Sequence, residues 1–162
     1  MKPTMLAVLF VAGLAYGQAG DPSKPFHYNG NSYVYYSPVC IKRDCMPLGV
    51  GAGAEGFLWR GLTLGVDLGY HHLTGEGVGF GLLSVNGGYH FTDRKKPVKF
   101  DPFVTAGYGL AFRQGVVNLV NYGGGVNWWF KPRIGARVEF RAWTIPQERI
   151  TATGFRFGVV FR

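Results

Sequence analysis

Six ionisable residues fall on the same side of segments in which every second residue shares a face: Glu55, Asp67, Arg137, Glu139, Arg141 and Arg156. His71 and His90 fall on that face too. Both signs of charge are present, so these side chains can pair and hydrogen-bond if they converge in a closed interior, where isolated charges are costly. The alternative is that they are surface charges in water. We expect an interior polar network and no catalytic centre.

The first residues of the chain are typical of an export signal. Lys2 precedes an apolar run over residues 5–14, and small residues follow it. This pattern predicts a secretory signal peptide over residues 1–19, with cleavage after Gly17 or Ala19. The run is too short to span a membrane as a helix.

Two cysteines, Cys40 and Cys45, lie in the polar stretch 38–47. Export to an oxidising compartment favours a local disulfide between them. Two cysteines without a nearby histidine pair are weak evidence for a metal site. We therefore expect a disulfide, with no metal and no cofactor.

The elements that would position these residues are β-strands, because apolar residues alternate with small or polar ones. Alternation is clearest in residues 62–72, where one face carries Leu62, Leu64, Val66, Leu68 and Tyr70. Seven other segments alternate similarly: 32–37, 46–59, 78–91, 102–113, 118–130, 134–144 and 151–162. The sequence predicts eight strands, no helix and one domain over residues 32–162, after a flexible leader over residues 20–31.

Composition indicates which strand face is outside. Charged residues are 16% of the chain, below the roughly 25% of a soluble domain, while 26 residues are Gly and 16% are aromatic. A soluble barrel buries its apolar face, and an outer-membrane barrel inverts this arrangement. Gly weakens a solvent-exposed strand but suits a narrow eight-stranded interior. The fold class predicted is therefore all-β, an eight-stranded antiparallel up-and-down transmembrane β-barrel.

Large aromatic residues near the strand ends support this prediction, because amphipathic rings are enriched at both membrane interfaces. The interface aromatics we predict are Trp59, Tyr70, Tyr89, Phe112, Trp128, Phe130, Phe140 and Phe161.

The last strand, residues 154–162, and the Gly-aromatic texture of residues 49–55 and 107–109 carry a family resemblance. With the signal peptide and the eight alternating segments, they resemble the small eight-stranded outer-membrane barrels related to the transmembrane domain of outer-membrane protein A. The resemblance implies location in the bacterial outer membrane. It also implies contact with outer-membrane lipids and lipopolysaccharide, and recognition of the C-terminal strand by the barrel-assembly machinery.

The same resemblance implies a topology with both termini in the periplasm. Residues 38–46 then form an outer loop, and residues 92–101 form a periplasmic turn.

We expect a non-enzymatic protein with a structural or interaction role and a side-chain-filled lumen. One alternative is a lipid A deacylase-like enzyme, in which His72 would act as base on Thr74, with Glu76 nearby. The others are a small porin and a secreted soluble barrel that binds an apolar ligand. The net charge of +8 does not indicate nucleic acid, because the basic residues lie in turns and on the inner face. Oligomeric state stays open.

Overall fold

A computed structural model describes residues 29–41, 44–73, 78–92, 98–113 and 115–162. All regular structure in these residues is β-strand: β1 (Gly30–Tyr36), β2 (Val39–Ile41), β3 (Asp44–Met46), β4 (Leu48–Trp59), β5 (Leu62–Leu73), β6 (Val78–His90), β7 (Phe100–Phe112), β8 (Val116–Trp129), β9 (Ile134–Ile145) and β10 (Ile150–Phe161). None of the described residues form a helix that is long and apolar enough to cross a membrane. The predicted signal peptide, residues 1–19, and most of the predicted leader lie outside the described residues.

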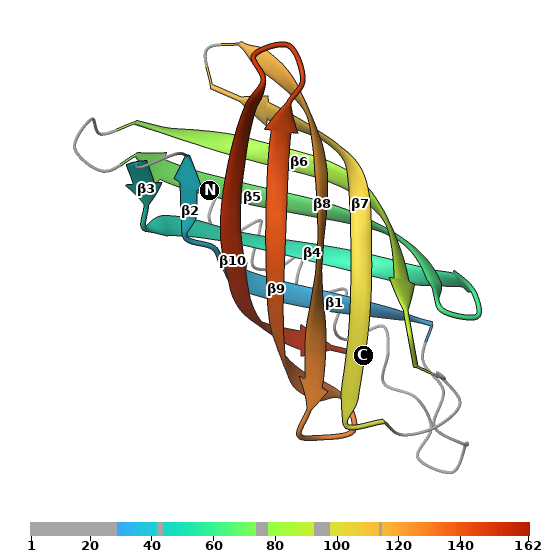
Figure 1. Ribbon diagram of the computed structural model, residues 1–162. Helices are drawn as coiled ribbons and strands as arrows, with labels where there is room; N and C mark the ends of the chain where they lie inside the picture. Colours follow the sequence, from blue (N-terminus) through green and yellow to red (C-terminus); the bar gives the residue numbers. More distant parts are fainter. Residues whose placement is uncertain (1–28, 42–43, 74–77, 93–97, 114) are drawn as a thin grey trace, which may run out of the picture.

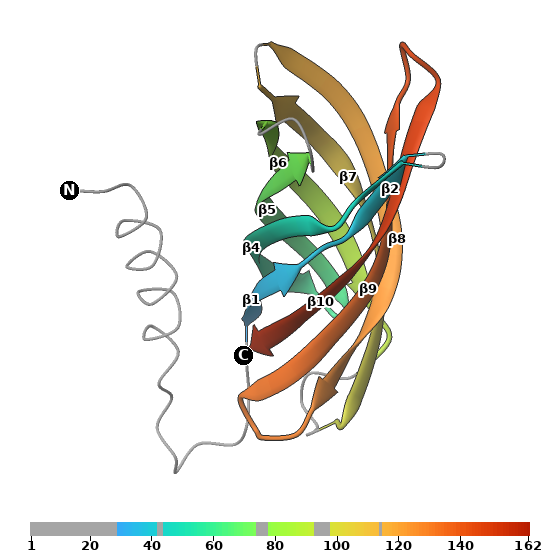
Figure 2. The ribbon, with the colours of Figure 1, turned by 90° about the vertical axis from the view of Figure 1, so that its left-hand side faces the viewer.

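Eight long strands form a closed antiparallel barrel (Figures 1 and 2). Each pairs with the next in the order β1-β4-β5-β6-β7-β8-β9-β10, and β1 pairs with β10 to complete the circle. The closing register runs from Ser32 opposite Phe161 to Tyr36 opposite Phe157. Closure leaves none of these eight strands with an unpaired edge, which a strand in lipid requires. The predicted eight-stranded antiparallel barrel is confirmed.

The two short strands extend one end of the barrel. β2 pairs with β10 and β3 pairs with β2, so together they form a hairpin beyond β1 and β4. The sequence predicted a loop over residues 38–46, and the structure has this hairpin there instead. Cys40 and Cys45 are directly opposite in its register and form a disulfide, with 4.0 Å between their Cα atoms. We call this end of the barrel the hairpin end, and the end where β1 begins and β10 finishes the terminal end.

Two strand boundaries differ from the predicted ranges. β1 begins at Gly30, two residues inside the range assigned to the leader. β7 begins at Phe100, so Asp101 belongs to a strand and its side chain is buried. The predicted turn over residues 92–101 therefore ends earlier, and Asp101 joins the inward face because it lies two residues before the buried Phe103.

The connection between β4 and β5 is a two-residue turn. Arg60 has a φ of 47°, and Gly61 packs so closely on His90 that a Cβ there would collide with the carbonyl oxygen of His90. Positive φ angles are typical of two-residue hairpin turns, since they match the right-handed strand twist.

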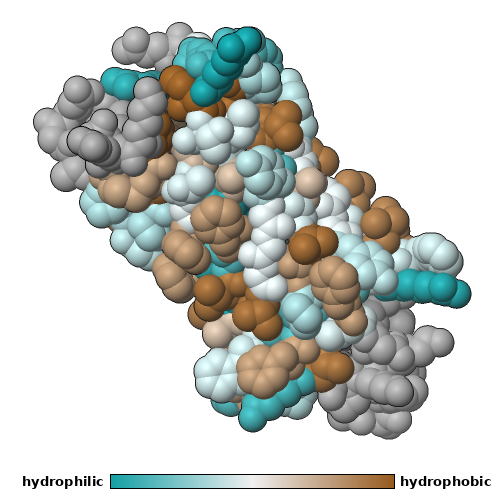
Figure 3. Space-filling model, viewed as in Figure 1, coloured by the Kyte–Doolittle hydropathy of each residue, from teal (hydrophilic) through white to brown (hydrophobic). Residues whose placement is uncertain are grey.

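The outward face of the barrel is apolar. Along β5, Leu62, Leu64, Val66 and Leu68 are exposed, and the residues between them face inward. Apolar side chains cover much of the wall formed by β7 to β10, with the most hydrophilic residues projecting at its ends (Figure 3).

Glycine on the inward face makes room for large inward side chains. A Cβ on Gly53 would lie 2.7 Å from the Tyr33 ring and 2.6 Å from Asp67 Oδ1, and a Cβ on Gly51 would collide with the Tyr35 ring. Tyr33 and Tyr35 can pack against β4 because Gly53 and Gly51 have no side chains there.

Candidate functional site

Four charged side chains meet inside the barrel at mid-height, and we call them the central cluster: Asp67 of β5, Glu139 and Arg141 of β9, and Arg156 of β10. Arg141 Nη1 lies 2.7 Å from Asp67 Oδ2, and Arg141 also pairs with Glu139. Arg156 Nη1 lies 3.3 Å from Asp67 Oδ2 and 3.8 Å from Glu139 Oε1. All four side chains are no more than 1% exposed. Their burial is tolerable because each charge faces at least one opposite charge.

A second set of charges, the terminal cluster, lies nearer the terminal end and comprises Glu55, His90, Asp101 and Arg137. The two ring nitrogens of His90 each face a carboxylate, with Nδ1 2.8 Å from Asp101 Oδ2 and Nε2 3.3 Å from Glu55 Oε1. Arg137 Nη1 lies 3.0 Å from Glu55 Oε1. Its Nε lies 3.1 Å from Glu139 Oε2, which links the terminal cluster to the central cluster.

Neutral side chains complete the hydrogen bonding of the buried carboxylates. The Tyr33 hydroxyl donates to Asp67 Oδ1 at 2.7 Å, and the Asn86 amide donates to Asp67 Oδ2 at 2.5 Å. At the terminal end, Asn31 donates to Glu55 and Asn127 donates to Asp101, both at 3.2 Å. Such bonds to charged acceptors are stronger than those between neutral groups.

Aromatic rings flank two of the guanidinium groups. Arg137 Cζ lies 4.2 Å from the Tyr33 ring centroid and 3.9 Å from that of Phe103. Arg156 Cζ lies 4.2 Å from the Tyr35 centroid. Cation–π contact adds to the ion pairs and holds each guanidinium in place. The two clusters together therefore bring four carboxylates, three guanidinium groups and one imidazole into one connected, largely buried network.

Toward the hairpin end the interior changes character and becomes apolar. Val39, Leu82, Leu119 and Trp143 form a buried cluster there, and further inward-facing side chains pack against it. They surround a cavity of about 80 Å³, which we call the apolar cup. His71 also lines the cup, with its ring 5.3 Å from Phe80 and 6.2 Å from Trp143 between centroids.

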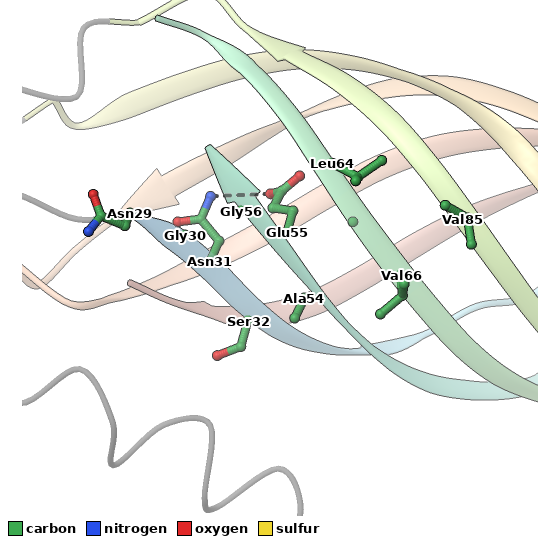
Figure 4. Close-up of a pocket in the computed structure, with 11 residues that line it drawn as sticks. Asn29, Gly30, Asn31, Ser32, Ala54, Glu55, Gly56, Leu64, Val66 and Val85 are labelled. Carbon is green, nitrogen blue, oxygen red and sulfur yellow. Dashed lines mark hydrogen bonds between the residues drawn. The ribbon is translucent and has the colours of Figure 1, made fainter. Parts of the chain in front are cut away.

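A separate groove of about 420 Å³ lies on the outside of the barrel near the terminal end, over β1, β4, β5 and β6 (Figure 4). It exists because the outward residues Ser32 and Ala54 are small, while Leu64, Val66 and Val85 continue the apolar wall beside them. The Asn31–Glu55 hydrogen bond borders it. We assign this groove to the outer wall and not to the interior.

The structure brings all six sequence-predicted charged residues, Glu55, Asp67, Arg137, Glu139, Arg141 and Arg156, into the two clusters. Of the two histidines on the same face, His90 joins the terminal cluster, whereas His71 lies apart in the apolar cup.

Sequence reasoning missed several members of the network: Asp101, Tyr33, Asn31, Asn86, Asn127 and also Asn121, whose side-chain oxygen accepts a hydrogen bond from Arg141 Nη1 at 3.3 Å. Alternation extended back from Phe103 would have found Asp101. The asparagines fall on the predicted inward faces, but nothing in their spacing indicates which carboxylate each one contacts. The apolar cup was also missed, because the predicted lumen was polar and Gly-rich along its whole length.

Seven of the predicted interface aromatics are exposed on the outward face, and Phe161 is half-buried. Trp59, Tyr89, Trp128 and Phe130 lie toward the terminal end, with Trp128 6.4 Å from Phe130 between ring centroids. Tyr70 and Phe112 lie toward the hairpin end. Phe140 differs from the prediction: it lies near the middle of β9, beside Phe155 at 5.5 Å, and so away from both rims.

The residues of the deacylase-like alternative are only partly described. His72 belongs to β5 and is half-buried, whereas Thr74 and Glu76 lie outside the described residues. Within the described part of the chain, no three His, Cys, Asp or Glu residues are grouped so that they could hold a metal ion.

No protein-family model and no curated sequence matches this chain. Several solved structures do match it in fold. The N-terminal β-barrel domain of OprF from Pseudomonas aeruginosa is 18% identical with a TM-score of 0.63, and the match covers 81% of this chain and 96% of that one. Neisserial surface protein A is 13% identical with a TM-score of 0.58, over 82% of this chain and 94% of that one. Ail, the attachment invasion locus protein of Yersinia pestis, is 11% identical with a TM-score of 0.56, over 82% and 95%.

Identities this low establish a shared fold and nothing further. Together with the closed eight-stranded architecture, they show that the chain has the fold of the small outer-membrane β-barrels. The resemblance read from the sequence is confirmed at this level.

Proposed function

We propose that this chain is an integral, non-enzymatic protein of the bacterial outer membrane with a structural or interaction role. One observation carries the proposal, which is the inverted polarity of the barrel. Large apolar side chains such as Leu68 (57% exposed) and Tyr70 (49% exposed) face outward, while their sequence neighbours Asp67 and His71 are each 1% exposed. In water the exposed apolar side chains would be unfavourable, whereas in a bilayer they lie against lipid chains. The buried inward charges are tolerable because they are paired inside the barrel.

The lumen in this proposal is closed by side chains. Asp67 on β5 and Arg141 on β9 meet across the interior, and Glu55, His90 and Arg137 form a further level toward the terminal end. An eight-stranded barrel is just wide enough for such side chains and leaves no aqueous channel beside them. We therefore favour a structural or interaction role over that of a small porin.

The proposed orientation places the terminal end in the periplasm and the hairpin end outside. Arg60, Lys99, Lys131 and Arg133 are exposed at the terminal end, where basic side chains can bind the anionic head groups of phospholipids. The hairpin end would lie among lipopolysaccharide. The C-terminal strand β10 would be the segment that the barrel-assembly machinery recognises.

Gel mobility tests the membrane-barrel proposal most directly. The protein, refolded in detergent micelles, should migrate differently in SDS gels when loaded unheated and when boiled, because a closed barrel resists SDS until it is heated. The expressed protein should also sediment with outer-membrane fractions of the cell envelope. A chain that stays soluble without detergent and shows no mobility difference would overturn the proposal.

A further inference from the structure

The interior of the barrel has two chemically distinct parts. From mid-height to the terminal end, the central and terminal clusters are charged and hydrogen-bonded. Above them, toward the hairpin end, the cup is lined mainly by aliphatic and aromatic side chains, among them Val39, Leu82, Leu119 and Trp143, together with His71. The lining of the interior therefore changes from charged to apolar along the barrel axis.

Two polar atoms near the cup are covered and out of reach of a bound molecule. His71 Nδ1 and Trp143 Nε1 are both covered from solvent and have no hydrogen-bond partner. The surface that a molecule would meet in the cup is therefore apolar. A cavity of this kind excludes water and accepts apolar guests, because water would lose hydrogen bonds there.

The size of the cup suits a small guest. Its volume is about 80 Å³, whereas a single water needs roughly 10–15 Å³ by such a measure and an apolar cavity of about 150 Å³ holds benzene. Among the described residues, nothing fully covers the cup toward the hairpin end, since Ile41, Phe80, Ala111 and Ile145 on its wall are only half-buried. At about half the volume of the cavity that holds benzene, the cup encloses part of a single ring or the end of a short alkyl chain, with the rest of the molecule projecting through the mouth.

The floor of the cup is closed by charge. Arg156 Cζ lies 5.3 Å from the ring centroid of Trp143, and below it Arg156 faces Asp67 and Glu139. An apolar molecule gains nothing by moving into this layer, and it would have to displace ion pairs to do so. A guest that enters by the mouth must leave by the mouth.

The geometry points to the apolar cup as a binding site for small uncharged apolar molecules, of the size of one aromatic ring, taken up from the hairpin end. That this end faces the outside of the cell rests on the proposed function, but binding itself does not. A bound molecule would be retained in the cup and would not pass through the barrel, because the central cluster lies directly beneath the cup.

The test uses 19F NMR of the protein labelled with 5-fluorotryptophan and reconstituted in phospholipid nanodiscs, with toluene as the probe. Trp143 lines the cup, whereas Trp59 and Trp128 face outward and report only the toluene dissolved in lipid. The Trp143 resonance, assigned with a Trp143→Phe variant, should shift saturably, while the outward resonances should shift linearly. Benzoate, which has the same ring with a negative charge, should produce no saturable shift.

A matched pair of variants localises the effect. Ala111→Phe fills the cup and should weaken toluene binding at least tenfold, whereas Leu110→Phe adds the same ring at the neighbouring, outward-facing position and should leave it unchanged. If Ala111→Phe does not fold, Leu119→Ala enlarges the cup and should shift the preference from toluene toward naphthalene.

A linear response at Trp143, or equal binding by Ala111→Phe and the unaltered protein, would overturn the inference. The gel-mobility assay on the same preparation separates the two proposals. A closed barrel without saturable binding rejects the cup alone, and a chain that forms no barrel rejects the proposed function first.

Discussion

Arg141 and Asp67 are separated by 74 residues of chain and meet inside the barrel, with Arg141 Nη1 2.7 Å from Asp67 Oδ2. They belong to β9 and β5, which are four strands apart in the circle of eight and therefore face each other across the interior. This pair connects opposite walls of the barrel through a buried ionic contact. Its removal should affect the stability of the whole molecule.

Replacing Asp67 or Arg141 with Ala should each lower the free energy of unfolding by about 3–5 kcal/mol, because each leaves a buried partner uncompensated. The double variant should lose less than the two single variants together, with a coupling energy of about 0.5–3 kcal/mol. Urea titrations of the protein in detergent micelles, followed by tryptophan fluorescence, would measure all four states. Strictly additive losses would show that the contact contributes nothing. Leu68→Ala, at the neighbouring outward position on β5, is the control for the shortening of a side chain on the same strand.

Gly51 should not tolerate a side chain. A Cβ there would collide with the Tyr35 ring and lie 2.6 Å from the carbonyl oxygen of Leu68. We expect Gly51→Val to destabilise the barrel by about 1–3 kcal/mol through overpacking and to reduce the fraction that migrates as folded protein in unheated gels. Ala52→Val places the same side chain one residue along β4, on the outward face, and should fold normally. Equal folding of the two variants would contradict the inward packing of Tyr35.

The protein should show no steady conductance in planar bilayers, because Arg141, Arg156 and their partners cross the interior at mid-height. Removing one of these side chains with Arg156→Ala should produce small, measurable current steps, since the guanidinium group between Tyr35 and the acidic side chains is lost. Phe157→Ala, the outward neighbour, should stay silent. Stable open steps from the unaltered protein would refute a closed lumen and favour the small-porin alternative.

Mild reduction of intact cells should make Cys40 and Cys45 reactive toward a membrane-impermeant maleimide, because the disulfide joins them at the hairpin end. In a background with both cysteines changed to Ser, Lys131→Cys lies at the opposite end and should be labelled only after the outer membrane is permeabilised. The reverse pattern would mean that the hairpin end faces the periplasm. Labelling of both positions in intact cells would show leakage of the reagent, which a periplasmic marker protein detects independently.

Much of the fold could be predicted from local pattern. The pleat repeats every two residues, so Arg137, Glu139 and Arg141 must share one face of β9 whatever the rest of the chain does. The same rule placed the alternate residues Leu62, Leu64, Val66, Leu68 and Tyr70 on the outward face. Arg60 and Gly61 form the turn before them, in which Arg60 has a positive φ. Asp101 was misplaced because Pro102 was taken as the start of a strand. In the structure Pro102 faces outward within β7, and the strand begins two residues before it.

The sequence by itself determined the number of barrel strands, the side of each strand that is apolar, and most of the charges that are buried together, Asp101 excepted, since these depend on residue order along single strands. Only the tertiary structure decided which charges meet, because Asp67 contacts Arg141 through closure and register across eight strands. It also decided that the inward residues near the hairpin end form an apolar cup. These residues come from β2, β5, β6, β7, β8, β9 and β10, and no local pattern brings such distant positions to one level of the barrel.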